Sequence, residues 1–387
     1  MLAAIGAKKN NKVTILERNS KLGRKILATG NGRCNFTNIY TSSENYNNPS
    51  FVENVFEQFD VDKTIKLFSN LGIYPKVEDE GKAYPLSEQA QTITTLLELE
   101  LIKLDIEIIY EETVTDISYS NKLFFITTNK SFYEATKVIL STGGMALPQS
   151  GSDGIGYEIA KKFGHNIKNV YPSLTKIDLE SKYLNTLSGV KFPGKVSLVF
   201  NNKIVQEEES DVLFTKYGIS GPGILQLSRT LNRNIHNIDN AQIKVQLLTY
   251  INKFEFIERL KQTKDLTIKQ VLNGMLNNKI VNILSLELNL DLEKLVKELS
   301  KSEEQNLINI LFDWRFKIIG TRDFNESQGT IGGIDLNEVN SYTLESKKIK
   351  GLYFSGEVLD IDAFCGGYNL QWAWSSGYVA GHNASIK

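Results

Sequence analysis

The two ends of the chain carry related patterns, and this feature constrains the fold more than any other. Near the start, small apolar residues (2–7) lead through a polar turn into a short β-branched strand, 13–16, which ends in Glu17. At the other end, residues 351–381 contain a strand, a loop and a closing helix. Both patterns are typical of a nucleotide-binding βαβ fold, the first being the second half of such a unit. Because the residues between them have other patterns, we expect one discontinuous domain with an insertion.

The segment after the first strand alternates helical and strand-like patterns. Apolar residues recur at helical spacing over 51–72 and again over 92–104. Three strand-like runs follow, and a short "SNK" segment between the first two predicts a hairpin turn. The third run ends in a buried strand, 138–141, which leads into a Thr-Gly-Gly turn. This order of elements predicts an α/β domain.

The composition changes near residue 172. Short runs over 173–248 alternate apolar and polar residues, as in half-buried strands, whereas 254–312 repeats apolar residues at helical spacing. A length of 387 residues also exceeds what one hydrophobic core usually serves. The expected domains are a discontinuous α/β domain, 1–171 and 326–387, a β-rich insertion, 172–252 and 313–325, and a helical insertion, 253–312.

The overall composition argues against several classes of protein. Hydrophobic residues make up 41% and charged residues 23% of the chain, and the formal net charge is −1, so no general attraction to nucleic acid or to an anionic membrane is expected. No apolar run approaches the roughly 18 residues that cross a bilayer, and the N-terminus lacks the build of a signal peptide, which predicts a cytoplasmic protein. Two cysteines argue against a disulfide scaffold, and three dispersed histidines predict no metal site.

A basic, glycine-rich segment surrounds the first strand. From Lys8 to Arg33 there are eight Lys or Arg residues and one acid, Glu17. Glycines let the backbone approach a ligand and turn its amides toward anions. The positive charges of Arg24, Lys25 and Arg33 could in addition neutralise a diphosphate. In a dinucleotide fold, an acid in the position of Glu17 accepts hydrogen bonds from the adenosine ribose. The alternative for the glycine-rich segment is a flexible, solvated loop, and the alternative for Glu17 is an acid on the surface without a ligand.

Five longer motifs occur along the chain: "GRKILATGNGRCNFTN", "VILSTGG", "LFTKYGISGPGILQLS", "GTIGGIDLNEVNSYTLESK" and "GLYFSGEVLDIDAFCGGYNLQWAWSSGYVAG". Together and in this order they resemble the HI0933-like (BaiN/YhiN-type) family of bacterial flavoproteins. The resemblance covers nearly the whole chain. It implies a glutathione-reductase-like (Rossmann-type) FAD domain, discontinuous, with an inserted β-barrel-like domain and a small helical domain, and it implies non-covalently bound FAD.

The resemblance also implies roles for individual residues. Glu17 would hold the adenosine ribose, and the backbone of Val114 would pair with the adenine edge. The amides at the start of the last helix would face the flavin pyrimidine oxygen and stabilise negative charge on the reduced ring. The residues implied toward adenosine and the diphosphate are Glu17, Arg18, Arg24, Lys25 and Val114, and those toward the flavin are Gly30, Gly32, Arg33, Cys34 and Asn35. The turn against the cofactor would contain Thr142, Gly143 and Gly144, and the ribitol would contact Gly356 and Glu357. The start of the last helix would contribute Gly366, Gly367, Tyr368, Asn369 and Leu370.

The chain departs from the family at its front. Family members begin with a strand and a Gly-Gly-Gly-x-x-Gly loop that binds the FAD pyrophosphate, whereas this sequence begins about where the following helix would start. We expect either a start codon assigned too late or a truncated protein. For the chain as written we expect weak FAD retention and poor stability, because a central strand of a parallel sheet would be missing.

The implied reaction is hydride transfer through FAD. We predict an FAD-dependent oxidoreductase that reduces a C=C bond of a small molecule, with NAD(P)H docking transiently as electron donor, because no second complete GxGxxG unit is present. The alternatives are an rRNA uridine-to-dihydrouridine reductase of the same family, with rRNA as its partner, an amine oxidase, and a non-catalytic flavin-binding or regulatory protein. Cys365 is a candidate catalytic residue, and a redox pair with Cys34 is a further hypothesis.

Overall fold

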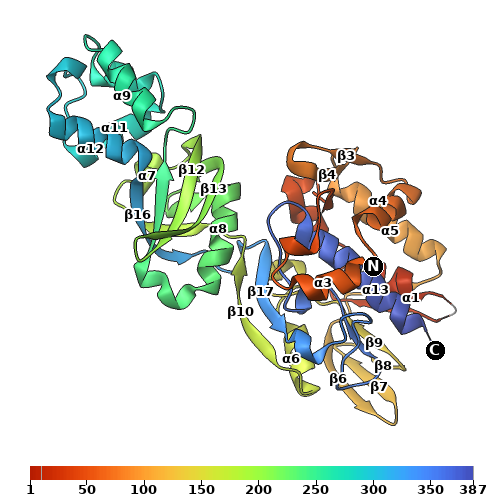
Figure 1. Ribbon diagram of the computed structural model, residues 1–387. Coiled ribbons are helices and arrows are strands. Elements are labelled where there is room, and N and C mark those ends of the chain that lie inside the picture. The colour runs from red at the N-terminus through yellow and green to blue at the C-terminus, as the bar shows by residue number, and fades with distance from the viewer. Residues whose placement is uncertain (10, 387) are drawn as a thin grey trace. The chain divides into compact units, whose positions relative to one another are not determined.

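The computed structural model of the protein describes residues 1–9 and 11–386. The chain divides into two compact units, one formed by residues 1–172 and 327–387 and the other by 173–326 (Figure 1). The first unit therefore contains both ends of the sequence, and the second is one continuous insertion. No helix among the described residues combines the length and the apolar character needed to cross a bilayer.

The two ends of the sequence pack together as helices. Helix α1 (Leu2–Ala7) lies against α13 (Tyr368–Ser385) (Figure 1). Their backbones approach so closely that a Cβ added to Gly381 would lie 2.0 Å from the backbone oxygen of Ala3. Only glycine fits at such a contact. The small residues at the start of the chain are therefore the contact surface for the last helix.

Two pairs of parallel strands form the centre of the first unit. Strand β1 (Thr14–Glu17) pairs with β5 (Glu107–Tyr110), and β9 (Val138–Leu140) pairs with β18 (Leu352–Phe354). The predicted helix before β5 is present as α5 (Ala90–Lys103). Parallel pairing requires crossover connections of this kind, usually helical. These elements confirm the predicted α/β class.

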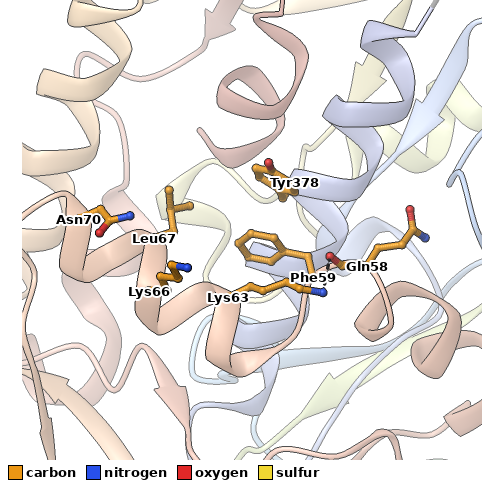
Figure 2. A pocket seen from close by; sticks show the side chains of 7 residues that line it. All are labelled: Gln58, Phe59, Lys63, Lys66, Leu67, Asn70 and Tyr378. Carbon is orange, nitrogen blue, oxygen red and sulfur yellow. Dashed lines mark hydrogen bonds between the residues drawn. The ribbon is translucent and has the colours of Figure 1, made fainter.

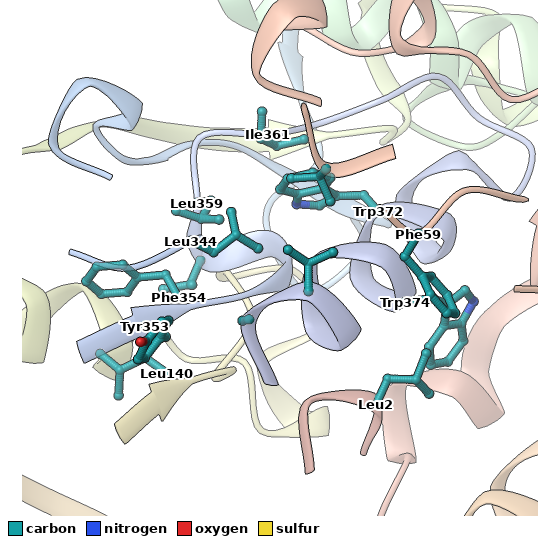
Figure 3. Packing of buried hydrophobic residues seen from close by; sticks show 14 of the residues in the cluster. Leu2, Phe59, Leu140, Leu344, Tyr353, Phe354, Leu359, Ile361, Trp372 and Trp374 are labelled. Carbon is teal, nitrogen blue, oxygen red and sulfur yellow. The ribbon is translucent and has the colours of Figure 1, made fainter. Parts of the chain in front are cut away.

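Helix α13 organises the core of the first unit (Figure 3). The indole N–H of Trp372 donates to the Gly356 carbonyl at 3.0 Å, and that of Trp374 donates to the Phe36 carbonyl at 2.8 Å. A buried indole is separated from water, so its N–H needs such a partner. The two bonds hold the backbone at positions 36 and 356 against one helix. Figure 3 also labels Leu2, Phe59, Leu140, Leu344, Tyr353, Phe354, Leu359 and Ile361 in this core.

The helical pattern predicted over 51–72 forms two helices, α3 (Pro49–Phe56) and α4 (Val61–Asn70). Asp60 explains the break, because its carboxylate accepts a hydrogen bond from the Lys63 backbone N–H at 2.8 Å and caps a new helix. Apolar residues keep their spacing across the break. The spacing alone therefore predicted the helical content but missed the boundary.

Two antiparallel sheets complete the first unit. The other elements of this unit are α2 (Arg24–Ala28), β2 (Thr37–Asn38), β3 (Pro75–Val77), β4 (Lys82–Pro85), β6 (Val114–Ser120), β7 (Leu123–Thr128), β8 (Phe132–Ala135), α6 (Ile155–Lys162) and β17 (Gly329–Ile334), the last of which pairs with β10 (Ile167–Ser173). The sheets have the orders β2-β4-β3 and β6-β7-β8. Between β6 and β7, Asn121 and Lys122 have φ angles of 50° and 63°, which is the conformation of a tight hairpin turn. The predicted "SNK" turn is thus confirmed.

The second unit begins with a closed barrel. Its strands, in spatial order, are β11 (Ile177–Glu180), β14 (Gly218–Ser220), β13 (Lys203–Phe214), β12 (Lys191–Phe200), β15 (Ala241–Gln246) and β16 (Trp314–Thr321), accompanied by helices α7 (Leu184–Leu187) and α8 (Pro222–Arg233). Along β16, the buried side chains Trp314, Phe316 and Ile318 alternate with more exposed ones, as expected for a strand with one face in a core. The barrel confirms the predicted β-barrel-like insertion.

A helical part lies between β15 and β16 in the sequence. Its helices are α9 (Lys253–Gln262), α10 (Ile268–Asn273), α11 (Asn278–Leu288) and α12 (Lys301–Phe312). Helix α12 begins with a capping box, because the Ser300 hydroxyl accepts from the Glu303 N–H at 3.2 Å and the Glu303 carboxylate accepts from the Ser300 N–H at 2.8 Å. The predicted helical insertion is confirmed.

Candidate functional site

Separate segments of the first unit meet at the Glu357 carboxylate. Lys25 Nζ lies 2.6 Å from Oε2 of this carboxylate, and the Gly144 N–H donates to the same oxygen at 3.3 Å. The Thr330 N–H donates to the other oxygen at 2.7 Å. The structure therefore brings together Lys25, Gly144 and Glu357, which were predicted on different motifs. Thr330 was missed, although its motif was recognised and a Thr between glycines could have drawn attention to it.

The turn at 142–146 is closed by the same threonine. The Thr330 hydroxyl accepts hydrogen bonds from the backbone N–H groups of Met145 and Ala146, at 2.9 and 3.1 Å. A Cβ on Gly144 would lie 2.4 Å from this hydroxyl, so the backbone passes too close for any other residue. Thr142 and Gly143, also predicted, lie in this turn directly after β9. The turn presents its backbone beside the Glu357 carboxylate.

The residues predicted toward adenosine gather around Asn19. The Glu17 carboxylate accepts from the backbone and side-chain amides of Asn19, both at 2.8 Å. Arg24 donates to the Asn19 side-chain oxygen at 2.9 Å, and Arg18 forms an ion pair with Asp153. These contacts hold both arginines near the end of β1.

Val114 begins an edge strand close to the same end of the sheet. The Glu112 N–H donates to the Glu17 carbonyl at 2.9 Å, so the chain runs beside β1 until two residues before Val114. Val114 pairs with Thr128 of β7 on one side, and its strand β6 has no strand partner on the other side among the described residues. The position of Val114 therefore leaves the unpaired edge of β6 close to Glu17.

The residues predicted toward the flavin form one contact between a loop and the start of α13. A Cβ on Gly367, whose φ is 99°, would lie 2.6 Å from the Thr37 carbonyl oxygen and 2.9 Å from Oδ1 of Asn35. Oδ1 of Asn35 is buried and has no hydrogen-bond partner among the described residues. Leaving a buried acceptor unpaired is costly, so the site lacks a donor at this point. Gly30 and Gly32 belong to the same loop, and a Cβ on Gly32 would meet open space.

Local hydrogen bonds brace the backbone in front of α13. The Asn369 side chain accepts from the Ala363 N–H at 2.9 Å, and Asn38 donates to the Gly366 carbonyl at 3.2 Å. The Tyr368 carbonyl accepts from the Tyr46 hydroxyl at 2.7 Å. Leu370, also predicted here, packs against the core of the unit. The start of α13 is thus held in a defined position while its first N–H groups lack helical partners.

Both cysteines are free thiols with raised pKa values. Burial raises the pKa of Cys34 to about 11, although a hydrogen bond with Thr29 opposes this effect. Burial also raises the pKa of Cys365, which lies near Lys82. The reactive form of cysteine is the thiolate, which a raised pKa disfavours. A catalytic Cys365 and a redox pair with Cys34 therefore stay hypotheses that the electrostatics do not support.

A cavity of about 480 Å³ opens beside the loop of residues 30–35, which contributes Arg33 to it. Its lining residues are Arg33, Lys76, Glu78, Asp79, Lys82 and Tyr84. The Arg33 guanidinium stacks over the Tyr84 ring, with Cζ 4.1 Å from the ring centre, and donates to Glu78 at 3.0 Å. Arg33 therefore already has a partner in this cavity. Lys82 and Tyr84 were not identified from the sequence, because "GKAYP" reads as an ordinary short strand.

A second cavity, of about 260 Å³, lies between α4 and α13 (Figure 2). Figure 2 shows Phe59 beside Tyr378, and their rings stack with centres 4.3 Å apart. Lys63 and Lys66 lie along its rim. None of its lining residues belongs to the predicted cofactor set, so we place the candidate site at Glu357, Asn35 and the start of α13.

Comparison with known proteins gives consistent matches over the whole chain. Residues 1–383 match the family described as HI0933-like protein Rossmann domain. A 3-dehydro-bile acid delta(4,6)-reductase of Clostridium scindens is 34% identical over 395 aligned positions, which cover 100% of this chain and 96% of the relative. A ribosomal RNA dihydrouridine synthase of Haemophilus influenzae is 32% identical and that of Escherichia coli 31%, each over 97% of this chain and 93% of the relative.

Proposed function

Because this chain belongs to the HI0933-like family, we propose that it is an FAD-dependent oxidoreductase that transfers hydride to a C=C bond of a small molecule. The observation that carries this proposal is the match of the entire chain to a relative named as a delta(4,6)-reductase. The names of the relatives share one chemistry. A 3-oxo compound with double bonds at positions 4 and 6, and the uracil ring of uridine, both present a C=C bond conjugated to a carbonyl group.

The residues of the site fit FAD. The unpaired acceptor of Asn35 matches the imide N–H of a flavin ring, which is a donor. Lys25 would lie toward the diphosphate, with its charge shared with Glu357 at 2.6 Å, and the Glu357 carboxylate would accept from the ribitol hydroxyls. Glu17 keeps one carboxylate oxygen for the adenosine ribose, since the bonds from Asn19 both go to Oε1. We therefore propose the residues predicted from the sequence as the FAD site.

The chemistry supplied by bound FAD is the acceptance and donation of hydride. The residues of this chain hold the site in position and polarise it. The positive end of α13 faces the start of the site at Gly367 and favours negative charge there. Thr330 and Gly144 hold Glu357 in one orientation through their N–H groups. We also propose NAD(P)H as the transient donor, because the sequence shows only one dinucleotide-binding pattern.

Reduction of rRNA uridine is the second candidate, favoured by the names of two relatives. The helical insertion, 253–312, offers no net positive charge to RNA, because its nine Lys and Arg residues are balanced by nine Asp and Glu residues, and four of its eight lysines are paired with acids. The pairs are Lys261–Glu258 at 2.7 Å, Lys269–Glu293 at 2.8 Å, Lys294–Glu303 at 2.9 Å and Lys297–Asp265 at 2.8 Å. RNA affinity depends mainly on free Lys and Arg that neutralise phosphates. This neutralisation supports the small-molecule substrate.

The test follows the flavin during both half-reactions. Under anaerobic conditions, NADH or NADPH should bleach the absorbance of the FAD-loaded protein near 450 nm. Addition of a steroid 4,6-dien-3-one should then restore it, while unmodified rRNA should not. If rRNA restores the flavin absorbance and dihydrouridine is formed in it, the protein is the rRNA uridine reductase instead. Bleaching by a primary amine would indicate an amine oxidase, and a flavin inert to all of these would indicate a binding protein.

A further inference from the structure

The hydroxyl of Tyr84 is free inside the 480 Å³ cavity. Tyr84 lies on β4 and is only 7% exposed, yet its hydroxyl forms no hydrogen bond with any residue in the described part of the chain. The ring is buried, but the hydroxyl is not among the buried polar atoms that lack a partner, so it reaches the open space of the cavity. A buried ring that presents its hydroxyl to a cavity makes that hydroxyl available to a molecule bound there.

The surroundings of Tyr84 belong to the candidate site. A Cβ on Gly30, in the flavin-side loop, would lie 3.3 Å from Cε1 of the Tyr84 ring. Lys82, two residues earlier on the same strand, approaches Gly366 in front of α13, where an added Cβ would lie 3.6 Å from its Cε. Tyr84 therefore stands between the loop and the helix start that we assign to the flavin.

We propose that Tyr84 is the catalytic acid of this reductase, a role that rests on the proposed function. The conjugated substrate receives a hydride from reduced FAD at the alkene carbon distant from the carbonyl. The electron pair of the double bond then forms the new C–H bond at the neighbouring carbon with the proton of the Tyr84 hydroxyl. The O–H bond breaks, the phenolate remains, and water returns the proton. One hydride and one proton are added, which balances the reduction of the double bond.

The electrostatics of the cavity suit this role. Burial raises the pKa of Tyr84, so the group is protonated at neutral pH and can donate. Arg33, which is stacked over the ring, and Lys82 lower the pKa in opposition to burial, and their charges favour the phenolate that remains when the proton leaves. The other candidate acids are less suitable. Lys82 is paired with Glu80, and Cys365, whose pKa burial also raises, is not among the residues that line the cavity.

The chemistry is the same for both candidate substrates. Reduction of the 4,5-bond of a 4,6-dien-3-one and of the 5,6-bond of uracil alike places a proton on the carbon next to the carbonyl. General acids of this kind contribute about 10²- to 10⁴-fold to rate. Loss of the Tyr84 hydroxyl should therefore slow the oxidative half-reaction by about that factor. It should leave reduction of the flavin by NAD(P)H or dithionite unchanged, since that step needs no proton at the substrate carbon.

The test compares Tyr84→Phe with Tyr74→Phe, a matched change on an exposed tyrosine beside the same sheet. Each variant is reduced with dithionite and mixed with a steroid 4,6-dien-3-one, and flavin reoxidation is followed in H₂O and D₂O. We expect Y74F to match the wild type, and Y84F to react at least about a hundredfold more slowly. We also expect Y84F to retain FAD, to bind the saturated 3-ketone product with unchanged affinity, and to lose the solvent isotope effect of the wild type.

Several results would overturn the proposal. Reoxidation of Y84F within threefold of the wild type would show that its hydroxyl donates no proton. A Tm lowered by more than about 5 °C would show that the hydroxyl has a structural partner instead. If the wild type itself is reoxidised neither by the dienone nor by rRNA, the proposed function fails and this role with it. A wild type active with either substrate, beside an equally active Y84F, would refute only the role of Tyr84.

Discussion

Lys25 and Glu357 are 332 positions apart in the sequence, yet Lys25 Nζ lies 2.6 Å from the Glu357 carboxylate. Both side chains are mostly buried, and the carboxylate also accepts two backbone N–H groups. A charge-assisted bond of this kind contributes about 1–2 kcal/mol after allowance for partial exposure. We expect Glu357→Ala to lower the free energy of unfolding by at least that amount, because Lys25 and two N–H groups lose their acceptor. Urea titration measures the loss.

The same substitution should weaken FAD binding about tenfold or more, since the ribitol hydroxyls would lose their acceptors. Flavin fluorescence quenching during titration of the apoprotein gives the Kd. Glu158→Ala is the control, because Glu158 pairs with Lys161 on the exposed face of α6. That control should change stability by less than about 0.5 kcal/mol. Equal effects of the two substitutions would contradict a cofactor role for Glu357.

Gly367 should tolerate no side chain. Its φ of 99° and the 2.6 Å between an added Cβ and the Thr37 carbonyl oxygen both oppose Gly367→Ala. We expect a loss of about 2 kcal/mol or more of unfolding free energy, together with reduced flavin content. Gly274→Ala is a suitable control, because Gly274 follows α10 with a φ of −71° and the nearest atom to an added Cβ at 3.4 Å. Thermal unfolding of both variants tests this prediction.

His165 should make stability depend on pH. Burial lowers its pKa from the ordinary 6.5, although Glu338, 3.3 Å from Nδ1, opposes the shift. The folded protein thus prefers neutral His165, while the unfolded chain takes up a proton at the ordinary pKa. This contribution is complete above pH 6.5 and decreases as the pH falls below it. Unfolding titrations from pH 8 to 5 should show a decline that His165→Gln reduces, and an identical slope in both proteins would refute the assignment.

The thiols should react slowly in the folded protein. With a pKa of about 11, Cys34 is almost entirely protonated at pH 8. We expect a thiol reagent such as DTNB to modify Cys34 at least about a hundredfold more slowly in the folded than in the unfolded protein. If the redox-pair hypothesis is wrong, Cys34→Ser and Cys365→Ser keep their turnover within about twofold. Loss of turnover in both variants, with FAD retained, would restore the dithiol hypothesis.

The sequence predicted those parts of the structure that depend on local patterns. The strand ending at Glu17, the hairpin at Asn121 and the strand at 138–140, of which only Leu140 is fully buried, all follow from spacing and turn residues. The barrel and the helical insertion follow from changes of period along the chain. The break at Asp60 was missed, because a helix cap is a local hydrogen bond that leaves the apolar spacing unchanged.

The site was predicted less completely. Motif resemblance named Lys25, Gly144 and Glu357 separately, but it did not show that they meet at one carboxylate. Tyr84 could not be found from the sequence, because its importance depends on an unbonded hydroxyl and on Arg33 stacked over its ring. Such features arise only when distant segments fold together. Pairing between distant residues is therefore the part of this site that local patterns omit.

The contact between α1 and α13 has a consequence for the order of folding during synthesis. Helix α1 is synthesised long before its partner α13, which carries Gly381 against Ala3. The barrel and its helices form the continuous stretch 173–326, so they can fold while the earlier residues still lack that partner. The nascent chain therefore exposes the apolar face of 1–172 until α13 has been synthesised, and chaperone demand should be greatest in that interval.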